Sequence, residues 1–343
     1  MTSISDIEEN TKMFEELGNT KKIDIIIYPE FKSFEAIGPM TVFTYANKIL
    51  QASGSLDRYH LTLRSTTIGP VISDTEISFQ ATESLDSIEA SNSVLLVGAH
   101  DIQRLVYENT ELKQWITNNA QKVDRFAALC SGAFFLAATG LLDGRRATTH
   151  WRMAGEFQSS FPHVIMDIDS IFIRDGNLWT SAGVSASIDL ALAFVEEDHG
   201  HKLALEVAQD LVIFLKRPGG QSQFSTNLMT QKTQLSSLRQ TQEWVFENLE
   251  KKINVSMMAD RASMSTRHFT RLFQKEVGMC PSEFLEKSRI DFARRLLSGG
   301  DLPLKTIAFK AGFTSSDHMR LTFKKHLSVT PKEYRSRFVK SHG

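Results

Sequence analysis

A cysteine lies where an apolar run of the sequence meets a segment of helical composition. Cys130 follows Phe126–Leu129 and precedes Ser131–Thr139. The small residues Ala128 and Gly132 stand two positions away on either side, which is typical of a tight strand-to-helix turn that points its central side chain outward. At a helix N-terminus a thiol has a lowered pKa, so the pattern indicates a nucleophile, a ligand contact or an oxidisable thiol. A buried structural cysteine is the plain alternative.

The segments around Cys130 alternate between strand and helix patterns. Four apolar runs fit the buried strands of a mostly parallel sheet: 23–28, 60–64, 94–97 and 126–129. Between them, Pro39–Leu50 and Leu112–Gln121 have helical composition. This alternation predicts a layered α/β domain, and in such sheets ligands bind at the edge where Cys130 is expected.

Length and charge indicate two domains with different partners. The 343 residues are about twice a usual domain, and a Pro- and Gly-containing stretch beginning at Arg217 predicts a linker over 217–234. Residues 235–343 hold 20 Lys and Arg against 11 Asp and Glu, a net charge of +9, whereas the rest of the chain carries −10. A basic end on an acidic body favours a polyanionic partner for that end.

The remaining composition excludes several classes. Cys130 and Cys280, the two cysteines of the chain, fall in different predicted domains, which argues against disulfides and for the cytoplasm. No apolar run approaches the length of a membrane helix, and the polar residues 1–21 are expected to be a flexible extension rather than a signal peptide. Because no Cys/His cluster or phosphate-binding loop is present, we expect no metal and no cofactor.

The last hundred residues contain an internal repeat. Ala259 and Ala262 recur 49 residues later as Ala308 and Ala311. After the turn the spacing is 50, and the recurring core positions are Phe269, Phe273, Pro281 and Phe284, which become Met319, Phe323, Pro331 and Tyr334. Each copy predicts a short helix, a turn and a longer helix: 257–262 and 265–277 in the first copy, and 304–311 and 315–327 in the second.

Two such units, joined by a helix over 281–297, could place their longer helices in successive major grooves of a duplex. Ser265 and Ser315 are expected as N-caps whose helix starts meet phosphates. Arg271 is expected to contact guanine. The residues expected to hold phosphates are Lys275, Lys324, Lys325 and Arg337. A helical bundle without DNA-binding function is the alternative.

Several segments resemble the AraC/XylS DNA-binding domain over residues 235–338: 259–273, 280–281, 308–313 and 330–334. The resemblance implies these base-reading positions: Arg267, Thr270 and Arg271 in the first copy, and Ser316, Asp317 and Arg320 in the second. The chain departs from the family pattern at Leu321, where relatives often have Arg, and at Ser328, where they often have Gly. We therefore expect the second copy to read bases weakly or differently.

A second resemblance covers roughly residues 22–200 of the predicted α/β domain, which spans residues 22–216. Ala128–Ala133 and Gly140–Trp151 resemble the ThiJ/PfpI, class I glutamine-amidotransferase-like superfamily, which implies a flavodoxin-like fold. The resemblance also implies a ligand site made of Glu35, Gly98, Ala99, His100, Cys130, Ser131, His150 and Ser185. Together, the two domains and their junction make the whole chain similar to the GlxA family of AraC-type regulators.

These observations predict a sequence-specific transcription regulator. We expect double-stranded DNA as its partner and a small-molecule effector bound near Cys130. The family resemblance implies a homodimer formed through the α/β domain. The resemblance implies a nitrogen-containing metabolite as one candidate effector. RNA polymerase is a further candidate partner, and no membrane is expected. The effector, the operator and the sign of regulation do not follow from the sequence.

Other functions stay open at this point. In an enzyme of hydrolase, hydratase or glyoxalase-like type, Cys130 would be the nucleophile and His150 a general base. In a redox sensor the thiol would be oxidised, although its domain has no second cysteine to resolve it. Structural roles for Glu35 and His150, and a plain interaction scaffold, are further alternatives. We expect no enzyme, because a promoter reader has no need of turnover.

Overall fold

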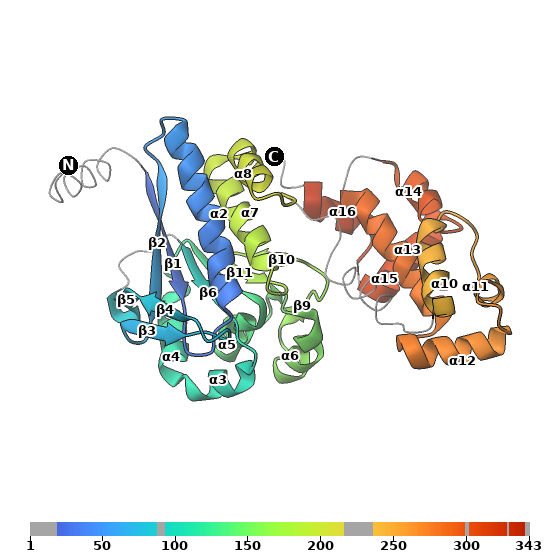
Figure 1. Cartoon of the computed structure of the whole chain (residues 1–343), viewed down its shortest axis with the longest axis horizontal. Coiled ribbons are helices and arrows are strands. Elements are labelled where there is room, and N and C mark those ends of the chain that lie inside the picture. The colour runs from blue at the N-terminus through green and yellow to red at the C-terminus, as the bar shows by residue number, and fades with distance from the viewer. Residues whose placement is uncertain (1–18, 88–92, 216–235, 299–301, 328, 340–343) are drawn as a thin grey trace. The chain divides into compact units, whose positions relative to one another are not determined.

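The computed structural model describes residues 19–87, 93–215, 236–298, 302–327 and 329–339, and it divides into two units, 1–216 and 217–343 (Figure 1). The first unit combines helices and strands, whereas the second is helical. The predicted linker 217–234, most of the predicted N-terminal extension and Ser328 lie outside the described residues. Each unit is considered by itself below.

A seven-stranded sheet forms the centre of the α/β unit, with the strand order β10-β11-β7-β6-β1-β2-β5. In that order the strands are Phe172–Asp175, Leu178–Ser181, Arg125–Ala128, Ser93–Leu96, Thr20–Ile26, Arg58–Ser65 and Glu83–Ser84. The β10–β11 pair is antiparallel and all the other pairs are parallel. The predicted mostly parallel sheet is therefore confirmed, and its four predicted strands correspond to β1, β2, β6 and β7.

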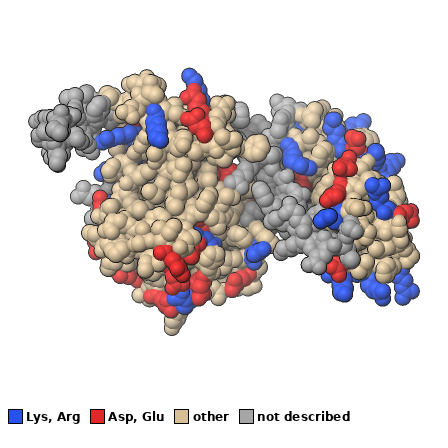
Figure 2. All heavy atoms as spheres, in the orientation of Figure 1, with Lys and Arg blue, Asp and Glu red and all other residues tan. Residues whose placement is uncertain are grey.

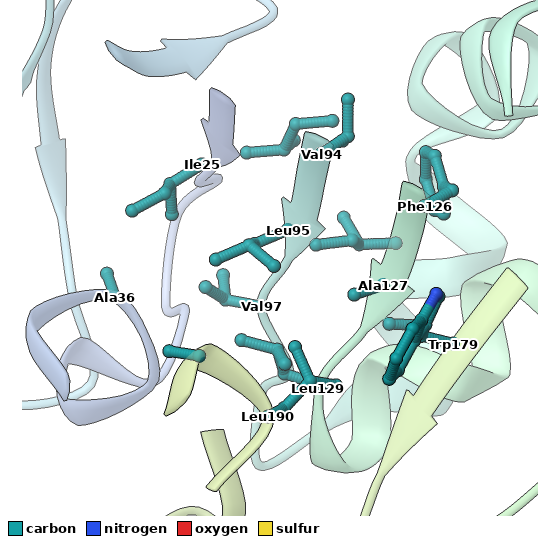
Figure 3. Close-up of a cluster of buried hydrophobic side chains, with 14 of the residues drawn as sticks. Ile25, Ala36, Val94, Leu95, Val97, Phe126, Ala127, Leu129, Trp179 and Leu190 are labelled. Carbon is teal, nitrogen blue, oxygen red and sulfur yellow. The ribbon is translucent and has the colours of Figure 1, made fainter. Parts of the chain in front are cut away.

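The central strands are apolar because helices cover both faces of the sheet. Every residue of β6 and β7 is buried. Figure 3 shows Ile25, Val94, Leu95 and Phe126 of the inner strands packed in one cluster. One group of contacting helices comprises α2 (Ser33–Ala52), α7 (Ala186–His199) and α8 (His201–Asp210). A second comprises α3 (Ile102–Glu108), α4 (Thr110–Asn119) and α5 (Ala133–Ala138), and α6 spans Ala154–Ser160.

Helix α2 begins six residues earlier than the sequence pattern predicts, and a hairpin explains this. The hairpin joins β3 (Gly69–Ile72) to β4 (Ser78–Ala81), and Asp74 lies in its loop. The Asp74 carboxylate accepts hydrogen bonds from the Ser33 backbone N (2.9 Å) and the Ser33 hydroxyl (3.0 Å), so it satisfies a helix start that has no cap of its own. A second small sheet pairs β8 (Arg146–Ala147) with β9 (Ile165–Met166).

The second unit contains two helix-turn-helix copies, as the repeat predicts. The first copy is α11 (Val255–Arg261) and α12 (Thr266–Val277), and the second is α14 (Leu304–Lys310) and α15 (Ser316–Leu327). The remaining helices are α10 (Ser236–Glu247), α13 (Pro281–Ser298) and α16 (Pro331–Val339). Phe269 and Phe273 are fully buried in one core cluster, and their repeat equivalents Met319 and Phe323 are fully buried in another.

The two turns use the same backbone conformation. Ser263 and Gly312, which are 49 residues apart, have φ angles of 56° and 74°. In each turn the next residue donates a 2.9 Å hydrogen bond to the equivalent alanine: Met264 to the Ala259 carbonyl, and Phe313 to the Ala308 carbonyl. The left-handed turn thus closes both copies, with a serine in one and a glycine in the other.

Candidate ligand site and candidate DNA-binding surface

Cys130 lies at a strained turn directly after β7. Its φ angle is 50°, in the region that non-glycine residues rarely adopt, and it opens a short 3-10 helix, Cys130–Gly132, that leads into α5. A Cβ at Gly132 would lie 2.8 Å from the Leu96 carbonyl oxygen, so the neighbouring strand β6 leaves room only for glycine there. The predicted tight strand-to-helix turn is present, but its side chain is completely buried rather than exposed.

Lys32 is a charged neighbour of the thiol. Its Nζ lies 3.4 Å from Cys130 Sγ, 3.4 Å from Ser131 Oγ and 3.8 Å from Glu35 Oε1. Its backbone N donates to the Gly98 carbonyl (2.9 Å), which fixes Lys32 next to the end of β6. Lys32 is itself buried, and its ammonium group contacts the strained turn Cys130–Gly132, called the elbow below.

Glu35 is a buried carboxyl group on the first turn of α2. Burial raises its pKa to about 7, although the Lys32 charge and the Gly98 amide, which donates to Oε2 at 2.6 Å, act in the opposite direction. The carboxyl group is therefore divided between its neutral and charged forms near neutral pH.

The thiol of Cys130 has a pKa well above its usual range. Burial is the main cause, the Glu35 charge raises it further, and Lys32 only partly opposes them. The expected lowering by a helix N-terminus is therefore wrong for this state, because desolvation outweighs the weak dipole of the short helices that follow Cys130. The thiol is protonated at neutral pH.

Two backbone amides beside the elbow are already occupied. The Gly98 amide donates to Glu35, and the Ala99 amide donates to Ser131 Oγ at 3.0 Å. Ser131 Oγ in turn donates to the Ala99 carbonyl at 2.7 Å. These amides could bind an oxyanion only if the Glu35 and Ser131 side chains moved away.

The longer helix of the first copy presents a basic exposed face. Ser265 caps it by accepting from the His268 amide at 3.3 Å, as predicted. Arg267, Arg271 and Lys275 are exposed, while Thr270 is half-buried and donates to the Thr266 carbonyl. Figure 2 shows Lys and Arg side chains spread over the visible face of the helical unit.

The longer helix of the second copy carries paired charges. Ser315 caps it by accepting from the His318 amide at 3.0 Å. Arg320 Nε donates to Asp317 Oδ1 at 3.2 Å. Lys325 donates to Glu286 of α13 at 2.7 Å, and Lys324 and Ser316 are exposed. Two of the expected contact residues, Arg320 and Lys325, thus have acidic partners within the protein.

The elbow and the sheet around it match a known family over more than half of the chain. The model of the DJ-1/PfpI family matches residues 21–197. This chain belongs to the DJ-1/PfpI family. A separate model, described as a helix-turn-helix domain, matches residues 258–337. A DJ-1/PfpI domain followed by a helix-turn-helix region is the predicted architecture, and it is confirmed.

Curated relatives include regulators with both regions and an enzyme with one. The chain is 28% identical over 315 residues to the HTH-type transcriptional regulator CdhR of Pseudomonas aeruginosa, covering 91% of this chain and 90% of that protein. It is 29% identical over 265 residues to the HTH-type transcriptional regulator GlxA of Rhizobium meliloti, covering 72% and 82%. It is 26% identical over 177 residues to an isonitrile hydratase of Pseudomonas putida, covering 51% and 71%.

The histidines expected at the DJ-1/PfpI site lie near its periphery. His150 is half-buried, stacks on Trp151 and accepts from the Arg152 amide at 3.2 Å. Burial, with the charges of Lys32 and Arg152, lowers its pKa to about 4, so its ring is neutral. His100 is 78% exposed, and its Nε2 lies 3.3 Å from Asp74 Oδ2. Glu35, Cys130 and Ser131 form the buried centre instead.

Ser181, the last residue of β11, contacts the elbow. Ser185 is exposed and precedes α7. Ser181 is fully buried, and its hydroxyl accepts from the Cys130 amide at 3.3 Å. Thr149, next to the predicted His150, donates from its hydroxyl to the Cys130 carbonyl at 2.8 Å. The backbone of Cys130 is thus held from two sides.

Lys32 and Asp74 are the neighbours of this site that sequence reasoning missed, whereas Ser181 lies in a segment, 181–185, that resemblance to the family places at the pocket. For Lys32 a signal existed, because a residue three positions before Glu35 shares its face when the segment is helical. Asp74 is far from Cys130 in sequence, so only the folded chain reveals it. In the described parts of the chain, no group of three or more His, Cys, Asp and Glu side chains could hold a metal ion.

Proposed function

We propose that this chain is a transcription regulator that binds DNA through α12 and α15 and responds to a small molecule at the Cys130 elbow. The proposal assigns effector binding and dimerisation to residues 22–216 and DNA binding to residues 235–338. The observation that carries it is the duplicated pair of N-capped helices with exposed polar faces. Such helices fit the major groove, where their first turns meet base edges and phosphates.

Selection of bound genomic fragments with the purified full-length chain tests DNA binding. We expect specific fragments whose affinity falls as salt is raised, because each Lys or Arg at a phosphate releases counterions. Within the described residues, no helix is long and apolar enough to cross a bilayer. A chain that retains no fragment even at low ionic strength would contradict the proposal.

The chemistry of the elbow suggests the class of effector. Lys32 offers a buried cation and Glu35 a buried carboxyl group 3.8 Å away. A ligand that displaces this contact must replace both partners, since an unpaired buried charge is costly. We therefore propose a small molecule that carries an anionic group for Lys32 and an amine or amide N–H group for Glu35, which agrees with a nitrogen-containing metabolite.

A thermal-shift screen with amino acids, simple amines and simple carboxylates tests this effector class. A ligand at 100 times its dissociation constant stabilises the folded state by about 2.7 kcal/mol. Lys32→Met should abolish the shift given by any compound that requires the anionic contact. Lys48→Met is the control, because Lys48 lies on α2, which Lys32 directly precedes, and its side chain is exposed over Tyr45. Equal shifts in both variants would exclude Lys32 as a ligand contact.

A thiol-dependent enzyme is the second candidate. The isonitrile hydratase relative favours it, as does the proximity of Cys130, Lys32 and Glu35. A protonated, fully buried thiol argues against it, because nucleophilic attack requires an accessible thiolate. Turnover of isonitriles or amides that is lost in Cys130→Ala, in a chain that binds no DNA, would favour the enzyme.

We further infer a homodimer that acts in the cytoplasm, with RNA polymerase as a further partner. Two copies of the DNA-binding unit on a repeated site would raise affinity through multivalency. Analytical ultracentrifugation of the free chain and of its DNA complex measures the number of copies. A monomer in both would contradict the homodimer.

A further inference from the structure

The two helices proposed to read DNA, α12 and α15, are called the reading helices below. They carry different side chains at equivalent positions. Their N-caps, Ser265 and Ser315, are 50 residues apart and make the same hydrogen bond. This register aligns Arg271 with Leu321. A single exposed leucine is ordinary on a protein surface, but Leu321 takes the place of an exposed arginine on the face that would meet DNA.

Leu321 is an apolar side chain that lies between charged residues on that face. Its side chain is 57% exposed. One turn before it, Asp317 binds Arg320 at 3.2 Å, so the two charges compensate each other. One turn after it, Lys325 binds Glu286 of α13 at 2.7 Å. The arrangement lets Leu321 approach a base edge between charged groups that are already paired.

Base edges in the major groove offer one prominent apolar group, the C5-methyl of thymine. Arginine matches the O6 and N7 acceptors of guanine, which leucine cannot contact favourably. Resting on the proposed DNA binding, we propose that the two copies read chemically different half-sites: the first reads guanine through Arg271, and the second reads a thymine methyl through Leu321. The operator would then be asymmetric within each pair of major grooves.

The test removes only the methyl group. After binding sites for the full-length chain have been selected from a random duplex pool, each thymine in the conserved positions is replaced by deoxyuridine. For the wild-type chain we expect one such replacement to weaken binding about fourfold, the effect of about 0.8 kcal/mol for one buried carbon. In Leu321→Ala, whose exposed site should not disturb folding, that replacement should have almost no effect.

Two further variants sharpen the assignment. Leu321→Arg should select guanine at the position where the wild-type chain selects thymine, because it reproduces the side chain of the first copy. Phe309→Ala is the matched control, since Phe309 is 59% exposed but lies on α14 rather than on the reading helix. It should keep the wild-type sensitivity to deoxyuridine.

The outcomes separate this inference from the proposed function. If the chain retains no DNA at all, the proposed function fails. If it selects defined sites but no deoxyuridine replacement weakens binding, only the reading by Leu321 is overturned. If Leu321→Ala leaves DNA binding and its deoxyuridine sensitivity unchanged but abolishes transcription in a reconstituted assay, Leu321 contacts a protein partner, which also overturns the inference.

Discussion

The two helix-turn-helix copies share their interior and differ at their surface. Equivalent positions hold Phe269 or Met319 and Phe273 or Phe323 in the cores, and all four side chains are fully buried. On the faces that would meet DNA, however, Arg271 corresponds to Leu321. Packing therefore fixes the backbone arrangement of each copy, while the exposed positions are free to acquire separate specificities.

The backbone arrangement that the two copies share should be most sensitive to substitution in the turn of the second copy. Gly312 has a φ angle of 74°, and a Cβ there would overlap the Leu249 carbonyl oxygen. We expect Gly312→Ala to lower the free energy of unfolding of the helical unit by about 3 kcal/mol or more, as measured by denaturant titration. Gly278→Ala is the control, because Gly278 has φ 79° but no atom near its Cβ position. Equal losses in the two variants would mean that the overlap relaxes without cost.

Arg271 should contribute more to DNA affinity than an exposed arginine elsewhere on the helical unit. Arg271→Ala should weaken binding to the selected site by about 1–3 kcal/mol, and it should relax the preference for guanine at one position. Fluorescence anisotropy with matched and mismatched duplexes measures both effects. Arg239→Ala removes an equally charged exposed side chain from α10 and should change the affinity far less. Uniform weakening on every duplex would instead assign Arg271 to a phosphate.

A substitution in the turn of the first copy should stabilise the helical unit, in contrast to the one in the turn of the second copy. Ser263 is exposed and has a φ angle of 56°, which costs a non-glycine residue about 1 kcal/mol. Ser263→Gly should therefore raise the free energy of unfolding by up to about 1 kcal/mol, less the entropy that glycine adds to the unfolded chain. Thermal and denaturant unfolding measure the change. A clear loss of stability would show that the two turns differ in more than their residue type.

The smallest expected effect is a loss of stability at acid pH that involves the second copy. Burial raises the pKa of Glu286, but hydrogen bonds from Lys325 and His326 outweigh it and lower the pKa overall. This link between α13 and α15 therefore stabilises the fold above the usual pKa of a glutamate, and the stabilisation is lost as the pH falls through the lowered value. We expect Glu286→Gln to remove this dependence, which is worth less than about 1 kcal/mol at this partly exposed site.

Unfolding curves at pH 7 and pH 3.5 measure that response. Glu283→Gln is the matched control, because Glu283 binds Lys287 on the same helix at 2.8 Å and acts on Lys325 of α15 more weakly than Glu286 does. It should leave the extra acid sensitivity in place. The prediction fails if the two variants follow the same pH profile.

The main strands and the two helix-turn-helix copies could be predicted because the sequence patterns that specify them are local. The runs that became β1, β2, β6 and β7 are apolar because both sheet faces are covered, and the repeat appears directly in residue spacing. The start of α2 was not predictable in this way. Ser33 begins the helix because Asp74, 41 residues further along the chain, accepts its hydrogen bonds.

The geometry of the candidate ligand site was predicted in part. The elbow at Cys130 follows from its small neighbours, and Glu35 follows from resemblance to the family. Lys32 and the raised pKa of the thiol did not follow, because they depend on which groups share the same buried space. A dipole can be read from a helix start, whereas desolvation depends on every segment that covers the sulfur atom.

The complete burial of Cys130 also gives the chain an internal reporter. Iodoacetamide can label the sulfur only when the covering segments open, so the labelling rate measures how often they do. A molecule that fills the site would slow this reaction, whereas one that props it open would accelerate it. Mass spectrometry of the tryptic peptide containing Cys130 would then rank compounds by how they change the opening, before any target promoter is identified.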